Sequence, residues 1–285
     1  MRIAIVSDSH LAPEASALND NWRAAACFVE HNDIDLTIHL GDITVDGAGD
    51  PTQYQWVRQL CAEWPTELCF LPGNHDIGDN PPAPGAVVDQ PITAERLARY
   101  RAAFGADYWA LDIDDWRLIG LNAQLMGSAL AAEEEQWHWL FDRAGEAGER
   151  PVVLMLHKPL CRADMADRTP SISYLPFVSR QRLRQAMAIM DVKAVLSGHR
   201  HQYLDHMVNG LRHLWVPSTA FYLPDSIQDR LGEKVTGLGV LELGESLRFD
   251  LVCPQGVQRH DILDHPIYPE VEHVRAQLRT AIGPG

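Results

Sequence analysis

Apolar and polar positions alternate along the chain in blocks that predict a succession of strands and helices. Short apolar runs bounded by turn residues are separated by longer stretches with helical spacing, and this alternation indicates layered α/β structure. In the first part of the chain the pattern predicts strands at residues 3–6, 36–40 and 68–71 and helices at residues 21–31, 53–63 and 93–104. Each predicted strand is therefore followed by a helix.

The second part of the chain repeats the alternation. The pattern predicts strands at residues 116–121, 152–156, 194–196, 211–216 and 238–243 and helices at residues 131–143 and 179–190. Asn209-Gly210 suits a tight two-residue turn, so a hairpin is expected there. Because no linker or internal repeat divides the chain, we expect one domain over residues 1–259. Residues 260–285 are expected to form a C-terminal extension that caps the site or joins subunits.

The composition supports a compact fold and argues against some partners. With 46% apolar and 22% charged residues, the 285-residue chain can bury a substantial core. The formal net charge of −15 opposes general attraction to long nucleic acid or to an anionic membrane surface. An acidic protein can still bind a phosphate ester where metal ions reverse the local field.

The cysteines and the first residues of the chain indicate the cellular compartment. The five cysteines are widely spaced and never form a Cys-x-x-Cys pair, which indicates reduced thiols rather than disulfides or a zinc knuckle. No apolar run approaches the roughly 18 residues that a membrane span needs, and no signal-peptide pattern opens the chain. The strand at residues 3–6 leads directly into candidate site residues, so cleavage there would destroy the site. We therefore expect a cytoplasmic protein with no membrane partner.

Polar side chains follow five of the predicted strands at the point where each strand ends. These groups are Asp8-Ser9-His10, Gly41-Asp42, Gly73-Asn74-His75-Asp76, His157 and Gly198-His199-Arg200-His201. Each group alone is compatible with ordinary turn chemistry. Together they supply carboxylates, imidazoles and an amide, which divalent metals accept as ligands. All of these groups lie at corresponding strand ends, where α/β sheets bind ligands.

The order of these five motifs closely resembles the calcineurin-like metallophosphoesterase family, and the resemblance spans residues 8–201. It implies a four-layer αββα sandwich of two mixed β-sheets flanked by helices, with two metal ions at the strand ends. The implied ligands are Asp8, His10, Asp42 and His201 for one ion and Asp42, Asn74, His157 and His199 for the other. Asp42 would bridge the ions, which suits the residue types because a shared carboxylate screens two cations roughly 3.5 to 4 Å apart.

The resemblance also implies a mechanism. Both ions would polarise the phosphoryl oxygens, and a hydroxide that they hold would attack phosphorus. His75 matches the family residue near the leaving oxygen, where an imidazole can stabilise or protonate that oxygen. Asp76 or Asp46 could orient its ring. Nitrogen and oxygen ligands accept iron, manganese, zinc or cobalt, so two divalent or mixed-valence ions are expected without a choice of element.

The segment after Asp42 narrows the range of expected substrates. It lacks the arginine of the family's protein phosphatases, while Gly47 and Tyr54 are similar to the branch of class III cyclic nucleotide phosphodiesterases and glycerophosphodiesterases. A small phosphodiester is therefore the expected substrate, and a homo-oligomer is possible because related enzymes often oligomerise. Asn122, which follows another apolar strand, could contact the phosphate, whereas Arg200 is expected to face solvent.

Three alternatives stay open. A phosphomonoesterase or a nuclease could use the same residues, although no basic track for long DNA is present. A non-catalytic binding scaffold would need no metal, but every implied ligand and His75 are in place.

The proline-rich and glycine-rich loop at residues 79–91 is either a connector or a frame for the substrate entrance.

Overall fold

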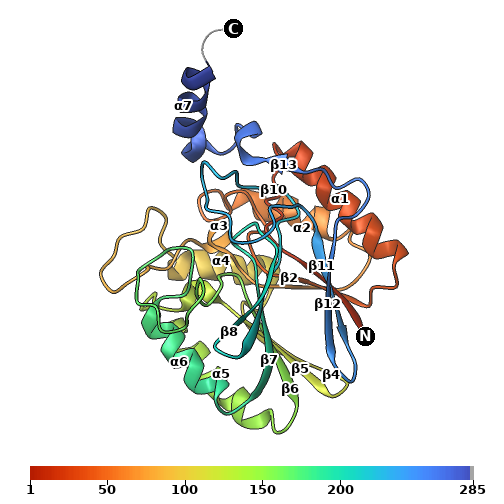
Figure 1. The fold of residues 1–285 in the computed structure, drawn as a ribbon, viewed down its shortest axis with the longest axis vertical. Coiled ribbons are helices and arrows are strands. Elements are labelled where there is room, and N and C mark those ends of the chain that lie inside the picture. Colours follow the sequence, from red (N-terminus) through yellow and green to blue (C-terminus); the bar gives the residue numbers. More distant parts are fainter. Residues whose placement is uncertain (283–285) are drawn as a thin grey trace.

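Two β-sheets face each other at the centre of the computed structural model, which describes residues 1–282 (Figure 1). The first sheet has the order β12 (Leu247–Val252), β11 (Leu238–Leu243), β1 (Arg2–Val6), β2 (Leu36–His39) and β3 (Leu68–Phe70). The second has the order β4 (Trp109–Ile113), β5 (Trp116–Leu121), β6 (Pro151–Leu156), β7 (Asp191–Ser197), β9 (Leu211–Trp215) and β8 (Leu204–Val208). In the first sheet β1, β2 and β3 pair in parallel, and β11 and β12 add antiparallel pairs on the β1 side. In the second sheet the middle strands pair in parallel and β4 and β8 pair antiparallel at the two edges, so both sheets are mixed.

Helices cover the outer face of each sheet. The first sheet carries α1 (Ser16–His31), α2 (Thr52–Cys61) and α4 (Ala94–Phe104), and the second carries α5 (Ala131–Glu146) and α6 (Phe177–Met187). The Thr93 side chain caps α4 by accepting a hydrogen bond from the main-chain N–H of Arg96. The expected four-layer αββα sandwich is confirmed.

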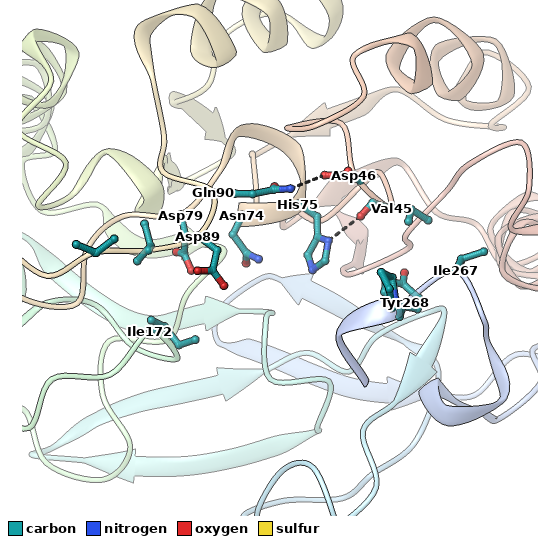
Figure 2. Close-up of a pocket in the computed structure, with 13 residues that line it drawn as sticks. Val45, Asp46, Asn74, His75, Asp79, Asp89, Gln90, Ile172, Ile267 and Tyr268 are labelled. Carbon is teal, nitrogen blue, oxygen red and sulfur yellow. Dashed lines mark hydrogen bonds between the residues drawn. The ribbon is translucent and has the colours of Figure 1, made fainter. Parts of the chain in front are cut away.

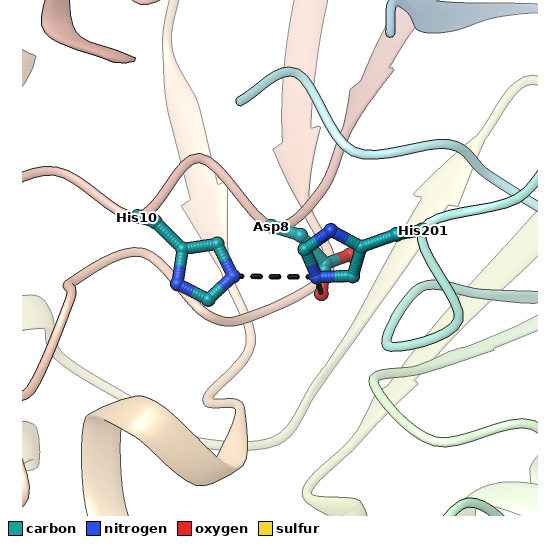
Figure 3. A group of neighbouring side chains, drawn as sticks. All are labelled: Asp8, His10 and His201. Carbon is teal, nitrogen blue, oxygen red and sulfur yellow. Dashed lines mark hydrogen bonds and ion pairs between the residues drawn. The ribbon is translucent and has the colours of Figure 1, made fainter. Parts of the chain in front are cut away.

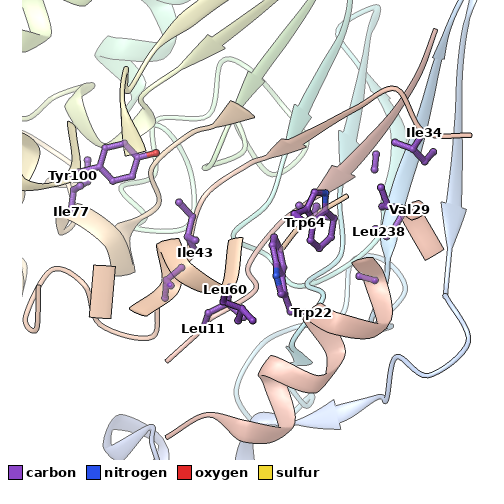
Figure 4. Packing of buried hydrophobic residues seen from close by; sticks show 14 of the residues in the cluster. Leu11, Trp22, Val29, Ile34, Ile43, Leu60, Trp64, Ile77, Tyr100 and Leu238 are labelled. Carbon is purple, nitrogen blue, oxygen red and sulfur yellow. The ribbon is translucent and has the colours of Figure 1, made fainter. Parts of the chain in front are cut away.

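The strands sit between two apolar layers because their residues alternate in direction. In β1, Ile3 and Ile5 join the core between the sheets, whereas Ala4 and Val6 face the helices. Figure 4 shows the helix-side layer, where the rings of Trp22 and Trp64 lie 4.0 Å apart between centroids. Each such buried side chain contributes roughly 1.5–3 kcal/mol, so the strand ends rest on a rigid support.

The hydrophobic pattern missed several elements. Helix α1 begins at Ser16 rather than at residue 21, and β4 and β12 were not predicted. Strand β4 includes Asp112, whose carboxylate pairs with Arg117 on the neighbouring β5, and a charged edge strand has a weak apolar signal. The predicted hairpin is confirmed, since Asn209 and Gly210 both adopt positive φ between β8 and β9.

The chain after residue 259 returns to the body of the protein. Strand β13 (His260–Asp261) pairs with β10 (Phe221–Tyr222), and η2 (Ile262–Asp264), η3 (Pro269–Val271) and α7 (Glu272–Ile282) follow. We call residues 260–282 the C-terminal segment; α7 projects from one end of the molecule (Figure 1). Among the described residues, none of the helices combines the length and apolar character needed to cross a membrane.

Candidate metal and phosphate site

The strand ends bring all seven predicted ligand residues to one place. Because β1, β2 and β3 are parallel, the residues that follow them lie at the same edge of the first sheet, and the ends of β6 and β7 meet them from the second. The residues gathered there are Asp8, His10, Asp42, Asn74, His157, His199 and His201. Most are almost fully buried, although the chain is acidic overall.

Asp8, His10 and His201 form the first group, which we call the His10 cluster (Figure 3). One ligand atom from each residue lies within 4.8 Å of the others. Nε2 of His201 is 3.3 Å from Oδ1 of Asp8 and 3.4 Å from Nε2 of His10. A single ion between these atoms could contact all three side chains.

Asp42, His157 and His199 form the second group, the His157 cluster. Nε2 of His157 lies 3.2 Å from Oδ2 of Asp42, from Nδ1 of His199 and from Oδ1 of Asn74. The same Asp42 oxygen is 3.9 Å from Nε2 of His10. The Asp42 carboxylate therefore lies between the two clusters.

Main-chain carbonyls fix the tautomers of two histidines. Nδ1 of His157 lies 3.0 Å from the carbonyl oxygen of Leu40, and Nδ1 of His201 lies 2.9 Å from that of Phe221. A carbonyl only accepts, so each Nδ1 carries its proton and donates it. When such a ring is neutral, Nε2 directs its lone pair toward the cluster, which is the arrangement of metal-binding histidines.

The charges in the two clusters compensate one another. Burial alone would raise the pKa of Asp8, but the adjacent His201 outweighs it and lowers the pKa. Burial alone would lower the pKa of His157, but Asp42 outweighs it and raises the pKa to about 9. The raised pKa of His157 favours a proton on that ring beside Asp42 in protein without metal, and a divalent cation can replace that proton.

The backbone is held in an unusual conformation at the same residues. Asp8, His10, Asp42, His199 and His201 all have positive φ, as do only four other non-glycine residues in the described chain. This conformation costs about 1–2 kcal/mol for a residue with a Cβ, although Asp and His tolerate it better than most. Strain concentrated at these turns is typical of a functional site.

Glycines allow the turns to approach closely. Gly41 has a φ of 105°, and a Cβ there would lie 2.6 Å from the main-chain nitrogen of Gly73. A Cβ on Gly73 would in turn collide with Asp42. The glycines in the Gly-Asp and Gly-Asn-His-Asp motifs are therefore needed for the packing of these turns.

His75 lies beside the clusters at the wall of a pocket (Figure 2). Its Nδ1 is 2.7 Å from the carbonyl oxygen of Val45, which accepts the Nδ1 proton. Asp76 or Asp46 was expected to orient the His75 ring, but the carbonyl of Val45 is the partner of Nδ1. Asp76 instead accepts hydrogen bonds of 2.9 Å from the main-chain N–H groups of Thr44 and Gly73, and so joins two turns of the site.

The pocket has a volume of about 610 Å³. It is lined by Val45, Asp46, Asn74, His75, Asp79, Val87, Val88, Asp89, Gln90, Ile172, Ile267, Tyr268 and Pro269 (Figure 2). The loop at residues 79–91 supplies five of them, so it frames the pocket rather than merely connecting elements. No lysine or arginine is among these lining residues, whereas three are aspartates.

A comparison with protein families identifies this group of site residues. A model of the family described as calcineurin-like phosphoesterase matches residues 1–203. The chain belongs to this family. It is therefore a metal-dependent phosphoesterase, and the family expected from the five motifs is confirmed.

The chain is similar over most of its length to bacterial members of the family. It is 27% identical over 235 residues to a 3′,5′-cyclic adenosine monophosphate phosphodiesterase, CpdA, of Escherichia coli K12, covering 77% of this chain and 76% of that protein. It is 27% identical over 275 residues to CpdA of Pseudomonas aeruginosa, covering 90% and 89%. A dimetal phosphatase from Danio rerio shares the fold with a TM-score of 0.61 at 13% identity, covering 88% and 95%.

Two residues singled out in the sequence have structural roles in this phosphoesterase. The Asn122 side chain donates to Asp107 and accepts from the main-chain N–H of Gln124, so it is occupied away from the pocket. Arg200 was expected in solvent, but its guanidinium is buried and bonded to Ser173 and Asp229. Its charge is therefore satisfied within the fold.

No motif in the sequence marks one part of the pocket wall. Ile267, Tyr268 and Pro269 come from the C-terminal segment, and Ile172 comes from the loop before α6. These apolar residues have no spacing that distinguishes them from other surface residues. The pairing of β13 with β10 helps to bring the C-terminal residues, which are distant in sequence, to the site.

Proposed function

We propose that this chain is a dinuclear phosphodiesterase that hydrolyses a small phosphodiester of the cyclic nucleotide or glycerophosphodiester type. The observation that carries the proposal is the position of Asp42 between the His10 cluster and the His157 cluster. One carboxylate oxygen faces histidines of both clusters. A residue in that position can be shared by two cations.

The donor set fits two ions of the kind that accept nitrogen and oxygen. One ion would be held by Asp8, His10, Asp42 and His201 and the other by Asp42, Asn74, His157 and His199. The lone pairs of imidazole nitrogens 3.2–3.4 Å apart repel each other unless a proton or a cation lies between them. Iron, manganese, zinc and cobalt all suit these ligands.

When bound, such ions polarise the phosphoryl oxygens and make hydroxide available near neutral pH. The chain's own residues then orient the ester. Asn74 and His75 line the pocket, so the phosphate of a bound ester would lie against this end of it. Because Nδ1 of His75 donates to Val45, its Nε2 is the nitrogen that can pass a proton to the leaving oxygen.

His75 also lies within reach of His10 and Asp42, in a third group with ligand-atom distances below 4.8 Å. We assign it to the leaving group rather than to an ion because it lines the pocket, whereas His10 and Asp42 do not. A general acid must meet the substrate, while a ligand need only meet the metal.

The charge of the pocket favours a diester over a monoester. The Asp79 carboxylate is neutralised by Lys158, but Asp46 and Asp89 add negative charge to a wall without lysine or arginine. A diester carries one negative charge, and a monoester carries nearly two at neutral pH. The monoester is therefore repelled more strongly by this wall.

The test is hydrolysis of bis(p-nitrophenyl) phosphate beside p-nitrophenyl phosphate by chelated protein resupplied with manganese. We expect turnover that depends on the metal and a higher kcat/KM for the diester. Cyclic AMP and glycerophosphodiesters would then be compared as substrates. A preference for the monoester would replace the proposal by a phosphatase, and no turnover with any of the four metals would revive a binding scaffold.

A further inference from the structure

His10 is held in place differently from His157 and His201, whose Nδ1 atoms face main-chain carbonyls. No group in the described part of the chain forms a hydrogen bond with its buried Nδ1. Aromatic rings surround it instead: the centroid of Phe221 is 4.9 Å away and that of Tyr268 is 5.7 Å away. The orientation of His10 therefore depends on ring packing.

Tyr268 contacts His10, a proposed ligand, and His75, the proposed acid. Its ring lies nearly perpendicular to His10 and His75, at interplanar angles of 85° and 86°. Edge-to-face contacts of this kind are favourable. Tyr268 is 2% exposed, so it is packed into the site rather than resting on its surface.

A separate apolar cluster carries Tyr268. It combines residues from the beginning of the chain, such as Ala12 and Leu18, with Ile262, Tyr268 and Val271 of the C-terminal segment. This cluster lies beside the metal site and is distinct from the core between the sheets. The C-terminal segment thus completes an apolar layer that the beginning of the chain starts.

Arg275 fixes the shape of the C-terminal segment. Its guanidinium is almost fully buried and donates to the main-chain carbonyls of Ile262, Leu263, His265 and Tyr268. Its charge is paired with Glu272. A buried cation that joins four carbonyls of one loop holds that loop in a single conformation, because each lost bond would leave a buried polar group unsatisfied.

The same segment reaches the site by a second route. Strand β13 pairs with β10 through Phe221 and His260. The carbonyl of Phe221 accepts the proton of His201 Nδ1, and its ring packs on His10, His201 and Tyr268. Two connections, one through the backbone and one through Tyr268, therefore end at the His10 cluster.

We propose that Tyr268 is a positioning residue for His10 and His75, and that Arg275 holds it in place, which makes the C-terminal segment a working part of the metal site. This inference rests on the proposed function for the role of His10. Loss of the Tyr268 ring would let His10 rotate away from the ion. Loss of an outer contact to a metal-binding histidine typically weakens metal affinity by about tenfold or more.

The experiment titrates Mn²⁺ and Co²⁺ into metal-free full-length protein by calorimetry and follows the visible absorption of bound Co²⁺. We expect Tyr268→Ala and Arg275→Met to weaken one of the two ions by about tenfold and to alter the Co²⁺ spectrum. Tyr268→Phe keeps the ring and should bind as the wild type does. Phe249→Ala, which removes a buried ring from β12, serves as the matched control for general destabilisation.

Each other outcome removes a defined part of the inference. Wild-type affinities in Tyr268→Ala and Arg275→Met would overturn the positioning role and leave the proposed function intact. Equal losses in Phe249→Ala would show a general effect of stability, and an equal loss in Tyr268→Phe would overturn the packing account. A wild-type protein that binds no ion would overturn the proposed function itself.

Discussion

The main-chain N–H of His75 donates a hydrogen bond of 2.8 Å to Oδ1 of Asp42. The other carboxylate oxygen, Oδ2, faces His157 at 3.2 Å and His10 at 3.9 Å. The residue that we propose to protonate the leaving group is thus attached to the residue that we propose to bridge the ions. The position of His75 is set by the same carboxylate that would set the positions of the metals.

Asp42→Asn should remove both ions. The amide keeps the shape of the side chain and an oxygen for the N–H of His75, but it lacks the charge that screens two cations from each other. We expect the metal content to fall well below two ions and kcat/KM to fall by about a thousandfold or more. Elemental analysis after gel filtration measures the first quantity. A variant that keeps two ions would refute a bridging role for Asp42.

Asn74→Ala should weaken one metal site and leave the other unchanged. Asn74 contacts His157 of the His157 cluster and is not part of the His10 cluster. Calorimetric titration should therefore show one weakened site and one unchanged site, with reduced turnover. Two unchanged sites together with full activity would remove Asn74 from the ligand set.

The fold and the cluster of polar residues follow from short-range patterns. Strand ends that carry Asp8, Asp42 and Asn74 can be read from the sequence because apolar runs end abruptly at polar residues, with a glycine before Asp42 and before Asn74. Parallel pairing then brings such ends together without further information. The ring partner of His75 could not be read in this way, because a main-chain carbonyl such as that of Val45 has no sequence signal.

His75→Ala should retain both ions and lose activity unevenly. If His75 protonates the leaving oxygen, its removal matters little for p-nitrophenolate, which leaves without help, and most for esters of basic alcohols. We expect losses that rise toward about a hundredfold to ten-thousandfold across a series of aryl and alkyl phosphodiesters. A plot of log kcat/KM against leaving-group pKa measures the change in slope. Parallel lines for the wild type and the variant would contradict an acid role.

Asp89→Lys should shift the preference of the enzyme toward monoesters. Asp89 is an exposed carboxylate on the pocket loop, and replacing it by a cation reverses its interaction with a second phosphate charge. The expected result is a severalfold rise in kcat/KM for p-nitrophenyl phosphate relative to bis(p-nitrophenyl) phosphate, reduced by added salt. Asp115→Lys, at an exposed aspartate outside the pocket, is the charge-matched control. The same shift in both variants would mean that net charge rather than the pocket wall selects the ester.

His213 should make the folded protein less stable in acid. Burial, with a smaller contribution from the facing His206, lowers the pKa of His213 from 6.5 to about 4. The folded protein therefore favours the neutral ring, and the stabilisation is fully present above pH 6.5 and is lost as the pH falls toward 4. The change is about 3 kcal/mol at pH 4.

His213→Phe removes this titration but keeps a ring against His206 in the sheet. Urea unfolding of both proteins between about pH 7.5 and pH 4.5 measures the difference in the free energy of unfolding, from which the shared contribution of the metal site cancels. We expect a constant difference above pH 6.5 and a growing advantage of the variant below it. If the difference stays constant over the whole range, His213 is not buried as a neutral ring, and the packing of β8 on β9 differs from that described.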